Sequence, residues 1–180
     1  MRILIVGIDS GVDGCAAAMD EDGKVRKMVS LFFTDVGKGM TKAGKKKTNK
    51  IPDEYKIGRT VRRMVKYAEK RNADLIIYLE KQQVFKGQGI VSSGKTMQGY
   101  GMWLGALAAQ KVRYATVHSK TWGKVMMMDA KGTDTKARSL NVARRLFPKV
   151  DLHLVKDHNK SDALLIAEYV RRKLIKGEDV

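Results

Sequence analysis

Residues 2–11 read Arg2-Ile3-Leu4-Ile5-Val6-Gly7-Ile8-Asp9-Ser10-Gly11, an apolar run that ends on an acid. A run this apolar predicts a central strand buried on both faces, because a half-buried strand would alternate apolar and polar residues. Asp9 then lies at the carboxyl end of the strand, and Ser10-Gly11 allows a sharp turn after it. A carboxylate placed there is costly unless it binds something charged, and a hard cation is the simplest partner. Strands also end in Asp for turn chemistry, so the role of Asp9 depends on whether other acids converge on it.

A second buried strand ends in the same way. Residues 73–80, Ala73-Asp74-Leu75-Ile76-Ile77-Tyr78-Leu79-Glu80, follow a predicted helix that opens at Pro52-Asp53-Glu54 and ends near residue 71. A strand, helix, strand connection normally places the two strands parallel, with their carboxyl ends at one edge of the sheet. We therefore expect Glu80 to lie near Asp9. The alternative is that Glu80 is an exposed loop residue.

The other predicted elements complete an α/β domain over residues 1–180. Apolar runs predict strands at 14–19 and 24–33, joined by an Asp-Gly hairpin turn, and a fifth strand at 112–117. Helical periodicity predicts helices at 96–111 and 133–147, and another that starts near Ser161. Residues 36–50 contain six lysines and no acid, which predicts a mobile basic loop. The result is one mixed five-stranded sheet with helices on both faces.

Composition narrows the function. The chain carries 36 Lys and Arg against 19 Asp and Glu, a net charge of +17. Such an excess predicts a polyanionic partner, with nucleic acid ahead of a membrane surface, although a basic protein without such a partner is the alternative. The single cysteine, Cys15, cannot pair within the chain, and we expect a buried spectator rather than a reactive thiol. With no membrane-spanning run or signal peptide pattern, the sequence predicts a soluble protein of a reducing cytoplasm.

A third acid comes from the last predicted helix. His158 precedes Asp162 by four residues, so both lie on one helical face if the helix begins at or before His158. The alternative is an ordinary helix N-cap with a dipole-compensating acid. Beside Asp9 and Glu80 we favour a metal-ligand role. This oxygen-rich set selects Mg²⁺, with Mn²⁺ able to substitute, and two ions about 4 Å apart would suit phosphodiester hydrolysis. His158 serves either as a ligand or as a proton carrier.

Three motifs carry a resemblance to a known family. Gly-Ile-Asp-Ser-Gly at 7–11, Leu-Glu-Lys-Gln-Gln-Val-Phe at 79–85 and Lys-Ser-Asp-Ala-Leu-Leu-Ile-Ala at 160–167 resemble the RuvC family of Holliday junction resolvases, in its phage-type variant. The similarity runs from residue 3 to about residue 172. It implies an RNase H-like fold, a homodimer, and paired Mg²⁺-dependent nicks in strands of like polarity at four-way junctions.

The resemblance assigns catalytic, metal-binding roles to Asp9, Glu80 and Asp162. The family usually has Asp or His three residues before the last aspartate, where this chain has Asn159. The fourth ligand is therefore open between Asn159 and its two preceding residues, Asp157 and His158. We favour His158, because its spacing of four keeps it on the face of Asp162.

The resemblance also assigns DNA contacts. The Glu motif has one extra residue before Phe85, whose counterpart in the family stacks on a base at the junction centre; core packing is the alternative. We predict that DNA is contacted by Lys45, Lys46, Lys47, Phe85, Lys86 and Lys160. The helix at 96–111 is the dimer element that the resemblance implies. One competing function is another RNase H-like nuclease, for instance one that cuts RNA–DNA hybrids. The others are a non-catalytic nucleic-acid-binding protein and, last, a sugar-kinase or actin-like ATPase.

Overall fold

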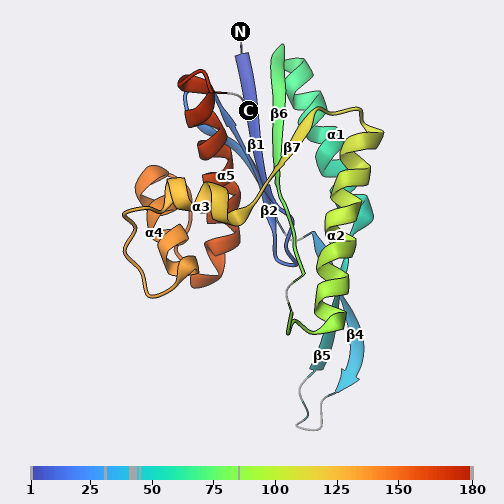
Figure 1. Ribbon diagram of the computed structural model, residues 1–180. Helices are drawn as coiled ribbons and strands as arrows, with labels where there is room; N and C mark the ends of the chain where they lie inside the picture. The colour runs from blue at the N-terminus through green and yellow to red at the C-terminus, as the bar shows by residue number, and fades with distance from the viewer. Residues whose placement is uncertain (1, 31, 41–43, 45, 85, 179–180) are drawn as a thin grey trace.

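The computed structural model describes residues 2–30, 32–40, 44, 46–84 and 86–178. Its centre is a sheet of five strands in the order β3-β2-β1-β6-β7 (Figure 1). In chain order these strands are β1 Arg2–Asp9, β2 Cys15–Asp20, β3 Val25–Ser30, β6 Ala73–Glu80 and β7 Tyr114–Val117. The central strand β1 pairs antiparallel with β2 and parallel with β6, which confirms the predicted mixed sheet.

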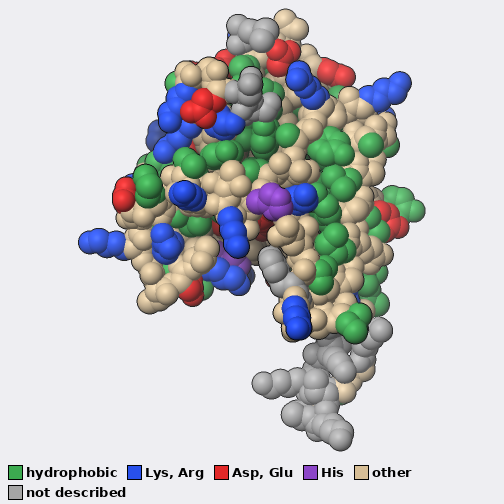
Figure 2. All heavy atoms as spheres, in the orientation of Figure 1, with side chains coloured by type: hydrophobic (Ala, Val, Ile, Leu, Met, Phe, Trp, Pro, Cys, Tyr) green, Lys and Arg blue, Asp and Glu red, His purple; other side chains and the backbone are tan. Residues whose placement is uncertain are grey.

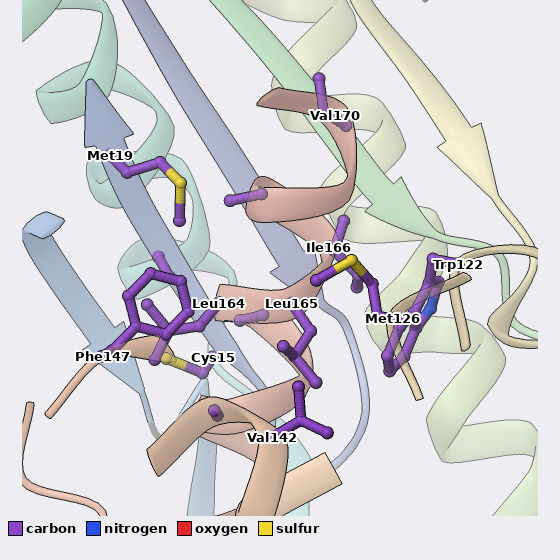
Figure 3. Close-up of a cluster of buried hydrophobic side chains, with 14 of the residues drawn as sticks. Cys15, Met19, Trp122, Met126, Val142, Phe147, Leu164, Leu165, Ile166 and Val170 are labelled. Carbon is purple, nitrogen blue, oxygen red and sulfur yellow. The ribbon is translucent and has the colours of Figure 1, made fainter. Parts of the chain in front are cut away.

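Helices cover both faces of this sheet, as the sequence predicts. One face packs against α5 His158–Ile175, with α4 Thr135–Leu146 and α3 Ser119–Met126 beside it. A short 3₁₀ turn, η1 Val155–Asp157, leads into α5. The other face packs against α1 Glu54–Lys70 and α2 Ile90–Ala109. Each face therefore has its own apolar core, and Figure 3 shows the first of them around α5.

Helix boundaries show where local signals suffice. The Asp53 side chain caps α1 by accepting a hydrogen bond from the Lys56 backbone N–H at 2.8 Å, as the Pro-Asp-Glu signal predicts. Helix α2 begins at Ile90, six residues before the predicted start at residue 96, so part of the segment interpreted as a loop is helical. Ile90 is 90% exposed and a glycine follows at position 94, so no apolar periodicity marks this first part of the helix in the sequence.

The prediction of a mobile basic loop at 36–50 is wrong in its secondary structure. Strands β4 Phe33–Met40 and β5 Lys46–Pro52 pair antiparallel as a two-stranded ribbon that extends beyond the main sheet (Figure 1). Lysine-rich strands are compatible with such a ribbon, because the described residues of β4 beyond Phe33 are exposed to water. At its base, Lys50 forms an ion pair with Asp13 in the β1–β2 turn.

A helix that crosses a bilayer must be long and predominantly apolar. Across the described residues, no helix has both properties.

Candidate active site

Two acids meet where the central strands end. Asp9 is the last residue of β1 and Glu80 is the last residue of β6. The strands run parallel, with Ile8 opposite Leu79, so the next residue of each strand lies at the same edge. The Ser10 hydroxyl donates to the Glu80 backbone carbonyl at 3.4 Å, which ties the two strand ends together. The predicted neighbourhood of Asp9 and Glu80 is thereby present in the fold.

Helix α5 brings a third acid to this edge. A Cβ added at Gly7 would lie 2.2 Å from the Ala163 carbonyl oxygen and 2.6 Å from the Ala167 backbone nitrogen. Only glycine lets the α5 backbone approach β1 so closely, two residues before Asp9. Asp162 precedes Ala163 in α5, so this contact sets Asp162 over the end of the strand. The helix begins at His158, which meets the condition for His158 and Asp162 to share a face.

The three carboxylates interact with one another electrostatically. Burial, together with the negative charges of Asp9 and Asp162, raises the pKa of Glu80 to about 8. Burial, followed by the charge of Asp9, raises the pKa of Asp162 to about 7. Asp9 is only 6% exposed, and burial raises its pKa although the Gly11 N–H donates to it. The site thus concentrates negative charge that a cation would offset.

Each carboxylate is held through one of its two oxygens. The Gly11 N–H donates to Asp9 Oδ1 at 2.9 Å, and the Trp122 indole N–H donates to Glu80 Oε1 at 3.3 Å. The Ser139 hydroxyl donates to Asp162 Oδ1. The three donors come from the β1–β2 turn, from α3 and from α4, so three separate elements orient the three acids.

The donor chemistry fits a divalent cation. Carboxylate oxygens that repel one another in a buried site are the ligands that Mg²⁺ and Mn²⁺ prefer. Within the described ranges, no group of three or more His, Cys, Asp or Glu side chains is spaced closely enough to hold a metal ion as it stands. The acids are therefore gathered and oriented at the strand edge, and the predicted convergence of Asp9, Glu80 and Asp162 to metal-bridging distance stays a prediction.

His158 lies at the rim of this group. Its Nδ1 is 3.1 Å from the Val155 carbonyl oxygen, which can only accept, so Nδ1 carries the proton in this hydrogen bond. The other ring nitrogen, Nε2, is then the one suited to a cation or a proton. The imidazole also interacts electrostatically with Asp9. The structure thus brings His158 near the acids, and its role as fourth ligand stays a prediction.

Asp157 is less suited to that role. Asp157 is 3% exposed, accepts from the Leu154 N–H at 2.8 Å and forms an ion pair with Lys160 at 2.8 Å. The hydrogen bond from Lys160 lowers the pKa of Asp157. Asp157 therefore shapes the turn before α5, and Lys160, predicted to contact DNA, is paired within the protein.

The other predicted DNA-contacting residues are placed only in part. Lys86 is exposed in the segment between β6 and α2. Lys46 and Lys47 belong to β5, and their side chains are not among those described. Lys45 and Phe85 lie outside the described residues. Their roles in binding DNA stay predictions.

Solved structures with a similar fold include that of T. thermophilus RuvC. The structure of T. thermophilus RuvC in complex with Holliday junction substrate matches 97% of this chain and 96% of its own, at 13% identity and a TM-score of 0.57. The chain has a RuvC-like fold. A second structure, that of Thermus thermophilus RuvC, matches 98% of this chain and 97% of its own at 15% identity and a TM-score of 0.49. No protein-family model and no curated protein matches the sequence.

The RuvC-like fold confirms the predicted fold class, an α/β RNase H-like architecture with a mixed five-stranded sheet. Because the match covers nearly the whole of both chains, the fold extends over the whole described structure rather than over one motif. At 13% identity the match carries the fold alone.

Some residues at the site were not predicted from the sequence. Lys136, in the first turn of α4, interacts electrostatically with Asp9 and Asp162 and favours their ionised forms. Trp122 and Ser139 read in the sequence as ordinary helix residues. A buried indole N–H and a buried hydroxyl both need acceptors, but the sequence does not say which acceptors they find.

Proposed function

We propose that this protein is a Holliday junction resolvase, a metal-dependent endonuclease that makes paired nicks in branched DNA. The observation that carries the proposal is the gathering of Asp9, Glu80 and Asp162 at the carboxyl edge of a RuvC-like sheet. The net charge of +17 supports a polyanionic substrate. The similar T. thermophilus structure contains a Holliday junction substrate, which favours branched DNA as that substrate.

The proposed catalytic chemistry assigns one task to each group. Asp9, Glu80 and Asp162 would hold two Mg²⁺ ions, or Mn²⁺ in their place. When bound, these ions would supply the positive charge and the activated water that phosphodiester hydrolysis needs. His158 would complete the ligand set or carry a proton at Nε2. Lys136 would place a cation beside the phosphate, since it already lies within electrostatic range of two of the acids.

DNA would be held by basic surfaces around the site. Figure 2 shows Lys and Arg side chains over the lobe formed by α3 and α4, next to a hollow between that lobe and α2. The carboxyl ends of β1 and β6 point toward this hollow in the same orientation (Figure 1). On the other side, the lysine-rich β4–β5 ribbon is tied through Lys50 to Asp13, a neighbour of the site whose charge raises the pKa of Asp9. Phosphates bound along the ribbon would therefore lie next to the catalytic edge.

Paired nicking requires two active sites, and we propose that the protein acts as a homodimer through α2. The buried side of α2 includes Tyr100, Trp103 and Leu107. On the same helix, a Cβ added at Gly101 or Gly105 would meet open space, so these positions leave room for another backbone to approach closely.

A cleavage assay tests the proposal. The protein is incubated with a four-way junction, a linear duplex and an RNA–DNA hybrid, with Mg²⁺ or with chelator. We expect symmetric nicks in the junction when Mg²⁺ is present and no cleavage in chelator. Preferred cleavage of the hybrid would instead identify another RNase H-like nuclease, and binding without cleavage would identify a non-catalytic DNA-binding protein.

Single substitutions test which acids are needed for cleavage. Asp9→Asn, Glu80→Gln and Asp162→Asn should each abolish cleavage and largely retain junction binding, since each removes one charge without removing bulk. Asp74→Asn is the matched control, because Asp74 is an exposed acid at the other end of the same strand as Glu80. Full activity in any of the three variants would refute the role assigned to that residue.

A further inference from the structure

Two buried side chains outside the acid group reach it from the α3–α4 lobe. Trp122 is 3% exposed and Ser139 is 1% exposed. Each directs its polar hydrogen at one carboxylate, Trp122 at Glu80 Oε1 and Ser139 at Asp162 Oδ1. We infer that Trp122 and Ser139 are positioning residues that fix the Glu80 and Asp162 carboxylates for cation binding. The inference rests on the proposed function and adds residues to it.

The behaviour of a second buried serine shows that the Ser139 contact is specific. A serine inside a helix can satisfy its hydroxyl locally, by donating to the carbonyl of the residue four positions earlier. Ser161 does so, with its hydroxyl 3.2 Å from the Asp157 carbonyl oxygen. Ser139 instead donates across to Asp162 on α5. This hydrogen bond therefore joins two helices at the site.

Chain topology explains why Trp122 reaches Glu80. Strand β7 pairs with β6 so that Val117 lies opposite Glu80, and α3 begins two residues later. Trp122 lies in the first turns of α3, with Met126 beside it near Ile166 (Figure 3). The short path from β7 into α3 thus places the indole next to the end of β6.

The lobe that carries both donors is braced internally. The Arg138 guanidinium donates to the Ala130 carbonyl at 3.1 Å and to the Met127 carbonyl at 2.7 Å, which ties α4 to the segment that follows α3. The Asp134 side chain caps α4 by accepting from the Ala137 N–H at 2.9 Å. Because α3 and α4 are connected in this way, the two hydrogen bonds to the acids act from one support.

The geometry suits cation binding. Each donor engages one oxygen, so Oε2 of Glu80 and Oδ2 of Asp162 can turn toward a cation. Hydrogen bonds of this kind orient metal-binding carboxylates, and their removal typically weakens metal affinity about 10- to 100-fold. The hydrogen bonds also lower the pKa of both acids, against the effect of burial.

The test measures Mg²⁺ binding to the DNA-free protein by isothermal titration calorimetry. Trp122→Phe and Ser139→Ala should each weaken binding about 10- to 100-fold, and Ser139→Thr, which keeps the hydroxyl, should restore it. Trp103→Phe and Ser161→Ala are matched controls. Trp103 is a buried tryptophan whose ring packs on Phe32, and Ser161 is a buried serine whose hydroxyl donates to the Asp157 carbonyl. In the cleavage assay, Ser139→Ala should need more Mg²⁺ for half-maximal rate and recover most of the maximal rate at saturation.

The outcomes separate this inference from the proposed function. Wild-type affinity in folded Trp122→Phe and Ser139→Ala proteins, checked by circular dichroism, would overturn it, as would an equal loss in both controls. If Ser139→Ala does not fold, the Mg²⁺ affinities of the other two variants decide. Wild-type affinity in Ser139→Thr with weaker affinity in Trp122→Phe supports the inference, and equal affinities in the two overturn it. A wild-type protein that binds Mg²⁺ without cutting junctions rejects the proposed function alone. A wild-type protein that binds no Mg²⁺ rejects both.

Discussion

Replacing Glu80 with glutamine should stabilise the metal-free protein at alkaline pH. The pKa of Glu80 rises from an ordinary 4.5 to about 8 through burial and the charges of Asp9 and Asp162. Since one pKa unit corresponds to about 1.36 kcal/mol, ionising Glu80 in the folded protein costs on the order of 5 kcal/mol. Glutamine removes that charge and keeps an oxygen that can accept from Trp122.

The direction of this stability difference depends on the pKa of Glu80 in the folded and in the unfolded chain. Below pH 4.5 Glu80 is protonated in both states, so wild type and Glu80→Gln should have similar free energies of unfolding. Above it the unfolded chain loses the proton first, because the folded pKa is the higher one. Wild type should therefore lose stability relative to the variant as pH rises from 4.5 to about 8, and the difference should then level off.

Urea denaturation from pH 5 to 9 in chelator measures this difference. Mg²⁺ should shrink it, because a cation that binds the folded wild type offsets the repulsion. Asp74→Asn, on the same strand, should follow wild type across the whole range. Parallel stability curves for wild type and Glu80→Gln would show that the acids are too far apart, or too well solvated, to repel one another.

Three further predictions concern packing, reactivity and DNA binding. Gly7→Ala should destabilise the protein by about 3 kcal/mol or more, because the new Cβ meets α5 backbone. Gly58→Ala in α1, whose new Cβ meets open space, is its control, and equal urea midpoints for the two variants would refute the close approach. Burial and the charge of Asp9 raise the pKa of the Cys15 thiol to about 12, so iodoacetamide should label it only after unfolding, and rapid labelling of native protein would contradict this. Neutralising Lys45, Lys46 and Lys47 should reduce the slope of log affinity against log salt by about 0.9 for each phosphate that the protein no longer neutralises. An unchanged slope would exclude these lysines from binding.

The central part of the fold could be predicted from the sequence. The strands that end in Asp9 and Glu80 are marked by long apolar runs, and the rule for strand, helix, strand connections then places their ends together. Asp162 followed from a motif and a helical spacing, both of which are local features. Local patterns and a general rule of topology were enough to place these three residues at one edge of the sheet.

The remaining features depend on contacts between distant segments. The β4–β5 ribbon forms by pairing of two polar strands, which no apolar alternation marks. Ser139 and Ser161 look alike in sequence, and only the packing of α4 on α5 decides that one of them bonds to Asp162. The ion pair of Lys160 with Asp157 could not be predicted from the sequence either, because it depends on the fold of the turn before α5.

The position of α5 has a consequence for when the protein can act. Residues 163–168 of this helix are buried, packed on β1 and β2, and Asp162 reaches the strand edge only through that packing. On the ribosome, the strands that carry Asp9 and Glu80 and the lysine-rich ribbon emerge before this helix does. Under the proposed function, a chain that has not yet formed α5 would therefore lack one of the three acids. The catalytic group would be complete only once α5 has packed on the sheet.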